Sequence, residues 1–473
     1  CADGGWGWFS GWGETSSPYF TALVVHGLLL SRQCQLPVPP QVLQRGLEWL
    51  QAYQQETLRC LQLPPKQYRH KPHADDLDAL VFQVLAVARE EQYYQEHMAA
   101  LLFRDKKHLS PYSKALFALA EWERLQLPGT QESSAPQTQR LQELLRNLRQ
   151  FVQSDDENQT AWLNLGPGNF WWCWHGDEIE TQAAFLKLLC RTGEGQGELS
   201  RGLVKYLLHN RKHGKYWRST RSTAAVLEAF SVFLEASGEG RSELEVELLL
   251  NGRTLAQERY SPQNIFTARN RFLVPAEDLP PGEQVLKIRK NGPGPLYFNA
   301  YLQYFSQQDF IPAAGLEVKV QRGTYRLIRE DEQSSTAAAG GRAQSVRRER
   351  YRRELLPPRA VLQSGELLEI EMLLESKNDY EYMLLEDHKA ACCEALELRS
   401  GYGDNSLNAY QEFRDDRVAM FIPLLPRGKH TLSYRLRVEA SGEFSALPTK
   451  LTGFYAPELQ ANAEEQKISV ESE

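Results

Sequence analysis

The sequence lacks the patterns that mark the common enzyme and membrane-protein classes. It has no run of about 18 apolar residues, so no segment is expected to span a bilayer as a helix. Gly-x-Ser-x-Gly, the phosphate-binding loop and His-Glu-x-x-His are all missing. These absences argue against serine hydrolases, P-loop nucleotidases and zinc proteases, and they leave repeats and periodicity as the main signals.

Cysteine is also scarce, and the chain has no excess of basic over acidic residues. The 473 residues carry a net charge of -7, which argues against a nucleic-acid-binding protein because such proteins usually present a basic face. None of the seven cysteines belongs to a Cys-x-x-Cys pair, so neither a zinc site nor a disulfide scaffold is expected. The cysteines are Cys1, Cys34, Cys60, Cys173, Cys190, Cys392 and Cys393. No metal and no cofactor is expected.

The start of the chain shows no signal peptide. A complete motif follows Cys1 directly, so we expect the sequence to begin inside a domain. The alternative is that Cys1 is the acylated terminus of a processed lipoprotein, which would anchor the protein to a membrane through lipid. The length allows two to four domains.

A glycine-punctuated aromatic turn that leads into an apolar helix occurs three times. The turns and helix starts are residues 3–9 with 19–27, 171–174 with 178–184, and 214–217 with 219–225. Such repetition indicates an internally repeated helical domain. The turns could pack one helical hairpin onto the next, or their tryptophans could line a ligand site.

Helical periodicity continues to about residue 240. Apolar stripes at helical spacing run from Leu43 to Tyr53, from Leu77 to Leu85 and from Leu141 to Phe151. Ser110-Pro111 is typical of a helix start. Turns such as Leu127-Pro128-Gly129 separate the helices, which predicts antiparallel helical hairpins.

The densest polar cluster of the helical region contains His70, His73, Asp75, Asp76 and Asp78. The acids could hold Mg²⁺ for a diphosphate substrate, or act as proton donors as in terpene cyclases. The alternative is an acidic first helical turn, which the helix dipole favours. His26 is expected to be structural, and His209, Lys212 and His213 to complement the dipole at the end of a helix.

Strand periodicity begins near Gly238. Leu244, Val246 and Leu248 alternate with glutamates, and Asn251-Gly252 predicts a two-residue hairpin turn. Further strands are expected at 285–289 and 297–305, within a β region of residues 241–312.

A second β region is expected over residues 313–473, with strands near 316–320, 367–374, 381–386, 418–422, 431–438 and 447–455. Residues 331–345 are rich in Ser, Ala and Gly and are expected to form a mobile loop. The basic run Arg347–Arg353 is either the solvated face of a strand or an anion-binding patch. Cys392 and Cys393 lack a recognisable neighbouring base.

Residues 1–240 resemble the thioester domain of the bacterial alpha-2-macroglobulin family. The matching segments are Gly4–Trp8, Tyr19–Val24, Gly46–Leu50, Asp177–Ala184, Val204–Leu208 and Tyr216–Thr220. Residues 241–312 resemble half of a CUB domain. Residues 313–473 resemble the C-terminal macroglobulin, or receptor-binding-like, domain, through segments 379–387, 414–421, 444–448 and 455–458. The implied fold is multidomain α plus β: an α/α toroid followed by two antiparallel β-sandwich blocks.

The resemblance implies a protease inhibitor, not an enzyme, located outside the cytoplasm, with proteases as partners. In this family a protease cuts a bait region, and an exposed Cys–Gln thioester then acylates the attacker. No cysteine of this chain is followed by x-Glu-Gln, so the chain lacks the family's Cys-x-Glu-Gln motif. No catalytic, cofactor-binding or metal-binding residue is assigned.

Two other functions stay open. The chain could be a thioester-less adhesion or scaffold module. It could also be an α/α-toroid enzyme of terpene-cyclase type that uses Asp75, Asp76 and Asp78, although two β regions argue against that class.

Overall fold

The computed structural model describes residues 1–9, 11–127, 135–165, 177–212, 216–239, 243–265, 267–302, 310–337, 343–403 and 405–471, with side chains of 331–349 left out. The chain forms two compact units. The first comprises Cys1–Leu208 with Trp217–Ala300, and the second His209–Tyr216 with Tyr301–Glu473. α-Helices dominate the first unit and antiparallel sheets the second.

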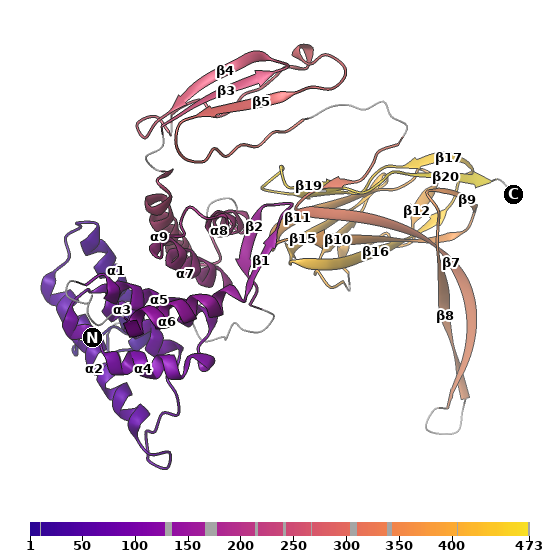
Figure 1. Ribbon diagram of the computed structural model, residues 1–473. Helices are drawn as coiled ribbons and strands as arrows, with labels where there is room; N and C mark the ends of the chain where they lie inside the picture. The colour runs from indigo at the N-terminus through magenta and orange to yellow at the C-terminus, as the bar shows by residue number, and fades with distance from the viewer. Residues whose placement is uncertain are drawn as a thin grey trace. The chain divides into compact units, whose positions relative to one another are not determined.

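The helices of the first unit follow one another along the chain (Figure 1). They are α1 Pro18–Gln33, α2 Pro40–Gln62, α3 Asp76–Val87, α4 Glu96–Arg104, α5 Pro111–Leu125, α6 Ala135–Arg149, α7 Glu178–Arg191, α8 Glu198–His209 and α9 Thr220–Ser237. The apolar stripes of the sequence fall on α2, α3 and α6, where most of their residues are buried. Phe151 lies beyond the end of α6.

The alternate helices α1, α3, α5, α7 and α9 contact one another in chain order. α3 is buried along every residue from Asp78 to Val87, whereas α2 and α6 bury one face only. Side chains of α9 also contact α1, since His26 pairs with Glu228. The core of the unit therefore lies among the alternate helices.

A short hairpin interrupts the helices, which the prediction of helices alone missed. β1 (Val152–Asp155) pairs with β2 (Thr160–Leu163), and β2 is buried throughout. The Gln182 side chain donates to the Leu163 carbonyl at 2.9 Å and accepts from its N–H at 2.8 Å. Four-residue strands are too short to show a period, and this one is held by a side chain from α7.

The expected hairpin at Asn251-Gly252 is present. β3 (Leu244–Leu250), β4 (Arg253–Tyr260) and β5 (Leu286–Asn291) form a sheet in the order β4-β3-β5. Asn251 and Gly252 have φ of 51° and 82°, as a tight hairpin turn requires. The strand expected at 297–305 is wrong over 297–302, which lack a pairing partner, while 303–305 lie outside the described residues.

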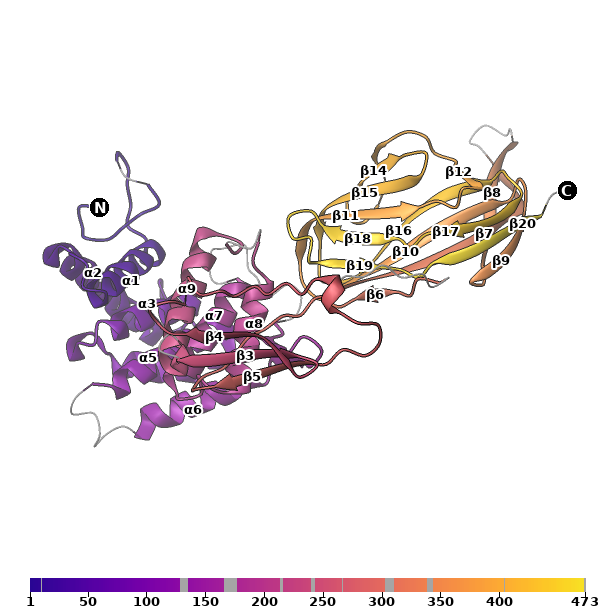
Figure 2. The same ribbon diagram turned by 90° about the horizontal axis from the view of Figure 1, so that it is seen from above.

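The second unit contains the remaining strands (Figure 2). They are β6 Ala314–Gly315, β7 Val318–Ala337, β8 Ala343–Leu355, β9 Arg359–Gln363, β10 Leu367–Ser376, β11 Tyr380–His388, β12 Cys393–Ala395, β13 Gly401–Tyr402, β14 Tyr410–Phe413, β15 Arg417–Leu425, β16 Gly428–Val438, β17 Gly442–Ala446, β18 Lys450–Gly453, β19 Gln460–Asn462 and β20 Gln466–Glu471.

These strands make three sheets, ordered β12-β16-β10-β7-β8, β13-β14-β15-β11-β18-β19-β6 and β17-β20-β9. β10 buries every second residue, and so does most of β16. Met372 and Leu374 of the five-stranded sheet belong to the same core as Leu385 and Met420 of the seven-stranded sheet.

The loop expected at 331–345 is wrong where the chain is described. Its residues up to Ala337 and from Ala343 onwards continue β7 and β8, with Ser334 opposite Val346. An antiparallel ladder needs only backbone groups, so it can extend through a polar, alanine-rich stretch. The basic run lies in β8, as the strand interpretation expected, and Arg353 pairs with Glu371 at 2.8 Å.

Candidate functional site

The repeated motifs of the sequence meet at the start of three helices. Asp177 caps α7 by accepting from the Glu180 N–H, and Ser219 caps α9 by accepting from the Ser222 N–H. α1 begins beside them with Pro18 at its first position and Tyr19 at its second. Asp and Ser are favoured at helix starts because their oxygens bind free backbone N–H groups.

Arg221 connects the three helix starts. Its Nε donates to Glu180 Oε1 at 2.5 Å, and its Nη1 donates to the Tyr19 hydroxyl. The Ser222 hydroxyl donates to Asp177 Oδ2 at 2.8 Å and lies 3.3 Å from Glu180 Oε1. We call Tyr19, Asp177, Glu180, Arg221 and Ser222 the helix-start cluster.

Burial dominates the electrostatics of this cluster. Glu180 is only 2% exposed, and its burial raises the pKa of the carboxyl, although Arg221 opposes the shift. Burial also raises the pKa of Tyr19. Asp177 and Glu180 accept hydrogen bonds from Ser222 and Arg221, so both carboxylates of the cluster are engaged within it. The arrangement joins one repeat to the next.

Trp6 of the first aromatic turn packs against α2. Asp3 Oδ2 accepts from the Trp49 indole at 2.8 Å, and the Trp6 N–H donates to Thr21 Oγ1 at 2.9 Å. A Cβ on Gly46 of α2 would lie 2.7 Å from the Trp6 ring, so the turn fits against α2 only because glycine is there.

The other aromatic side chains of the turns differ in exposure. Trp217 is buried and donates to the Leu207 carbonyl at 2.7 Å, which again indicates packing. Trp8, Phe9 and Trp12 are 68%, 58% and 102% exposed. The turn at 171–174 lies outside the described residues. Packing therefore accounts for Trp6 and Trp217.

The acidic residues Asp75, Asp76 and Asp78 of the polar cluster lie at the start of α3, where Asp75 caps the helix. Asp75 accepts from the N–H groups of Leu77 and Asp78, and Asp78 accepts from that of Asp75, at 2.9 to 3.2 Å. Asp76 accepts from the Ser110 N–H at 2.8 Å. Lys71 lies 2.8 Å from Asp75 and 2.6 Å from Asp78. The three carboxylates are therefore already engaged.

The neighbouring histidines have other partners. His70 contacts the Leu63 carbonyl at 2.7 Å, and the ring of His73 stacks on His108 at 4.1 Å. Burial and the Asp75 charge raise the pKa of Asp78 to about 6, whereas Lys71 keeps the pKa of Asp75 low despite burial. Across the described residues, no group of three or more His, Cys, Asp or Glu could hold a metal ion.

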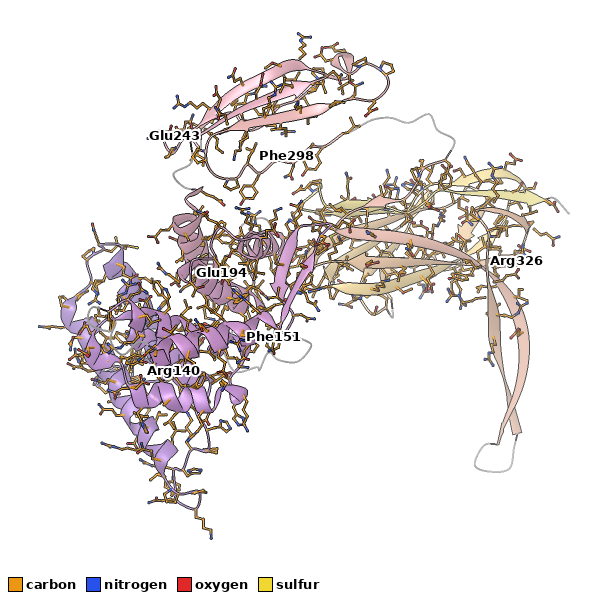
Figure 3. All side chains as sticks on the ribbon, viewed as in Figure 1. Arg140, Phe151, Glu194, Glu243, Phe298 and Arg326 are labelled. Atoms are coloured by element: carbon orange, nitrogen blue, oxygen red, sulfur yellow. The ribbon has the colours of Figure 1, made fainter. Side chains whose placement is uncertain are left out.

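A buried ionic network that the sequence did not indicate surrounds Arg140 of α6, which is labelled in Figure 3. Arg140 pairs with Glu96 at 2.8 Å and with Glu121 at 3.1 Å. Its side chain is 7% exposed, and that of Glu121 is fully buried. Burial raises the pKa of Glu121 to about 7. The signal available in the sequence was that Arg140 stands directly before the apolar stripe that begins at Leu141.

His26 and His209 both lie on helices. His26 lies 3.1 Å from Glu228, which also pairs with Lys187. His209 is the last residue of α8, as expected. Lys212 lies beyond that end, and His213 is outside the described residues.

Comparison with known proteins identifies relatives of the chain. Residues 318–458, which run from β7 past β18, match the family model described as the bacterial alpha-2-macroglobulin MG10 domain. Alpha-2-macroglobulin of Thermotoga maritima is 24% identical over 375 residues, covering 69% of this chain and 20% of that protein. An alpha-2-macroglobulin homolog of a Nostoc species is 22% identical over 338 residues, covering 70% of this chain and 16% of that protein. The chain thus spans a fifth or less of these relatives.

Solved structures give more distant matches. Escherichia coli alpha-2-macroglobulin activated by porcine elastase shares 16% identity at a TM-score of 0.40, covering 99% of this chain and 37% of that one. The trypsin-activated form of the same protein shares 16% identity at a TM-score of 0.42, covering 99% of this chain and 28% of that one. Among the helices of the described residues, none is both long and apolar enough to serve as a membrane span.

Proposed function

The chain belongs to the bacterial alpha-2-macroglobulin family, and we propose from this membership that it is the C-terminal part of a protease-trapping inhibitor. The match of residues 318–458 to the MG10 domain carries the proposal. Proteases are the proposed partners, the site of action lies outside the cytoplasm, and the chain acts as an inhibitor and not as an enzyme.

We assign three parts to this inhibitor. Residues 1–240 form a thioester-domain-like α/α toroid, 241–312 a CUB-like β region and 313–473 the C-terminal macroglobulin sandwich. The contacts of α1, α3, α5, α7 and α9 in chain order support a toroid with these helices inside. The shared core of the five- and seven-stranded sheets supports a sandwich.

The small β4-β3-β5 sheet supports the CUB assignment through its exposed apolar residues. Leu255 of β4 and Leu286 of β5 are 37% and 47% exposed, and Phe298, which follows the sheet in the chain, is 65% exposed (Figure 3). A three-stranded sheet with uncovered apolar residues is stabilised when a second sheet packs on it. In the full inhibitor, the other half of a CUB sandwich would supply that second sheet.

The chain's own residues supply framework and no acylating group. No cysteine of the chain precedes x-Glu-Gln, and the Ser222 hydroxyl is engaged by Asp177 within the helix-start cluster. Trapping by thioester would therefore depend on a Cys-x-Glu-Gln segment outside this sequence. The role of the helix-start cluster would be to keep the toroid rigid while the inhibitor rearranges.

The test compares this chain with a longer protein from the same coding region. Each is mixed with trypsin or elastase and resolved on a denaturing gel. We expect no covalent adduct from the 473 residues alone, and a methylamine-sensitive adduct from a longer chain that carries Cys-x-Glu-Gln. Its Cys→Ala variant is the matched control and should form none.

Two results would overturn the proposal. An adduct formed by this chain alone would show an acylating group within it. A longer protein with repeated β domains but no Cys-x-Glu-Gln, and no adduct, would favour the adhesion or scaffold function.

A further inference from the structure

Two adjacent free cysteines lie in the core of the second unit. Cys392 and Cys393 occupy the connection from β11 into β12 and are 1% and 3% exposed. Their Sγ atoms are 3.5 Å apart. This distance is short enough for one sulfur to approach the other after a small rotation of the side chains.

Positive charge is buried beside this pair. Arg322 of β7 has a side chain only 3% exposed, and its Nη1 has no hydrogen-bond partner. Its Nε lies 3.4 Å from Asp387, whose carboxylate also accepts from Tyr434 and Thr449. Lys389 is similarly buried and lies 3.4 Å from Glu394. The contact with Cys392 and burial raise the pKa of the Cys393 thiol, and both cations oppose this rise without reversing it.

The contact between the thiols sets which one reacts first. The hydrogen bond between the two thiols lowers the pKa of Cys392, and the same bond together with burial raises that of Cys393. Cys392 is therefore the more acidic thiol and the nucleophile of the first step, while Cys393 keeps its proton until the second step.

We propose that Cys392 and Cys393 form a site of reversible oxidation, which reacts with small disulfides such as oxidised glutathione to close a disulfide between neighbouring residues. The Cys392 thiolate attacks one glutathione sulfur, breaks the glutathione disulfide and releases one glutathione thiolate. Cys393 then loses its proton and attacks Cys392 Sγ, which releases the second glutathione. The protein gives up two electrons and two protons, and the glutathione disulfide becomes two thiols.

The chain geometry makes this disulfide easy to reduce again. Neighbouring Cα atoms are about 3.8 Å apart, whereas most disulfides join Cα atoms about 4.4–6.8 Å apart. Closing a ring across one peptide bond therefore introduces strain, and strained disulfides are the labile and regulatory ones.

Oxidation would also loosen the sheet edge. The Cys392 carbonyl accepts from the Glu439 N–H at 2.7 Å, and Cys393 is paired with Val438 of β16. Ring closure turns the peptide between the two cysteines, so these contacts cannot all persist. β12 has only three residues and lies at the edge of its sheet, which allows the local opening that admits the oxidant.

The test uses the native chain and does not depend on the proposed function. The protein is incubated with oxidised glutathione, denatured, alkylated with iodoacetamide and digested with trypsin, which releases residues 390–399 with both cysteines. We expect this peptide to lose about 2 Da, to carry no alkyl group, and to regain two alkylatable thiols after dithiothreitol. In the oxidised protein, amides of 436–440 should exchange roughly tenfold faster.

The chain contains its own control. Cys34 is exposed and should take up glutathione as a stable mixed disulfide. In Cys393→Ser, Cys392 should likewise retain one glutathione, because no second thiol displaces it. The proposal is wrong if residues 390–399 keep two alkylatable thiols once Cys34 is fully modified, or if either cysteine is joined to a different one.

Discussion

Arg221 is the side chain that connects the helix-start cluster at the scale of single residues. It binds Glu180 of α7 and Tyr19 of α1, residues far from it in the sequence. Glu180 is 2% exposed, so its charge depends on this partner. A buried carboxylate that loses its counter-ion destabilises the fold more than the ion pair itself stabilises it.

We expect Arg221→Met to lower the free energy of unfolding by about 2–3 kcal/mol, less than for a fully buried pair because the Arg221 side chain is 33% exposed. Urea denaturation followed by circular dichroism measures this loss. The exposed Arg218→Met is the matched control and should change stability by less than about 0.5 kcal/mol. Adding Glu180→Gln to Arg221→Met should restore part of the loss, and no restoration would contradict the argument.

Glu121 gives the helical unit a pH dependence. Its burial raises the folded-state pKa from the ordinary 4.5 to about 7. The folded state therefore binds the proton more tightly than the unfolded state, so stabilisation is full below pH 4.5 and is lost as pH rises through 7. Relative to Glu121→Gln, the wild type should lose on the order of 2–3 kcal/mol between pH 4.5 and 8.

Unfolding free energies measured every half pH unit above pH 4.5 test this prediction. Glu91→Gln is the control, since that side chain is 86% exposed, and it should follow the wild-type profile. A wild-type profile parallel to that of Glu121→Gln would contradict the assignment.

At the scale of elements, the aromatic turn fits onto α2 through one glycine. A Cβ at Gly46 would lie 2.7 Å from both the Trp6 ring and Val25 Cγ2. Gly27 of α1 is exposed, and a Cβ there would meet no atom within 4 Å. The two helical glycines therefore differ in their surroundings and not in their backbone.

We expect Gly46→Ala to destabilise the fold by about 1–3 kcal/mol through overpacking. Gly27→Ala should instead be neutral or stabilise by up to about 1 kcal/mol, because alanine favours helix. Thermal and urea denaturation of both variants separate these effects. Equal responses of the two variants would show that Trp6 does not pack tightly on α2.

At the scale of the whole molecule, each unit has its own core and its own buried ion pairs. Asp387 in the second unit is fully buried and compensated by Arg322, Thr449 and Tyr434. Residues distant from one another and without shared partners contribute additively. The stability of each unit should therefore respond to its own substitutions.

We expect Asp387→Ala to destabilise the second unit by about 3–5 kcal/mol, because Arg322 is left buried without a counter-ion. Scanning calorimetry of Asp387→Ala should show a lower transition temperature for the second unit and an unchanged one for the first. Arg221→Met should lower the transition temperature of the first unit and leave that of the second unchanged. The exposed Asp415→Ala is the control. A single transition shifted by both variants would contradict independent units.

Local signals predicted most of the elements. The stripe from Leu43, the Ser110-Pro111 start and the Asn251-Gly252 turn each depend on neighbours within a few residues, and each is present. The expectations failed where pairing partners decide the outcome. Among the described residues, 297–302 pair with no strand. The polar residues of β7 after residue 331 do pair, with β8.

The sequence by itself determined the helical repeats, the change to β structure near residue 240 and the family resemblance, because periodicity and motif order are properties of the chain alone. Only the tertiary structure decided that Tyr19, Glu180 and Arg221 form one cluster, that Arg140 and Glu121 are buried together, and that Arg322 pairs with the buried Asp387. Such contacts join residues on different elements, and burial, which sets their charge and reactivity, exists only once those elements pack.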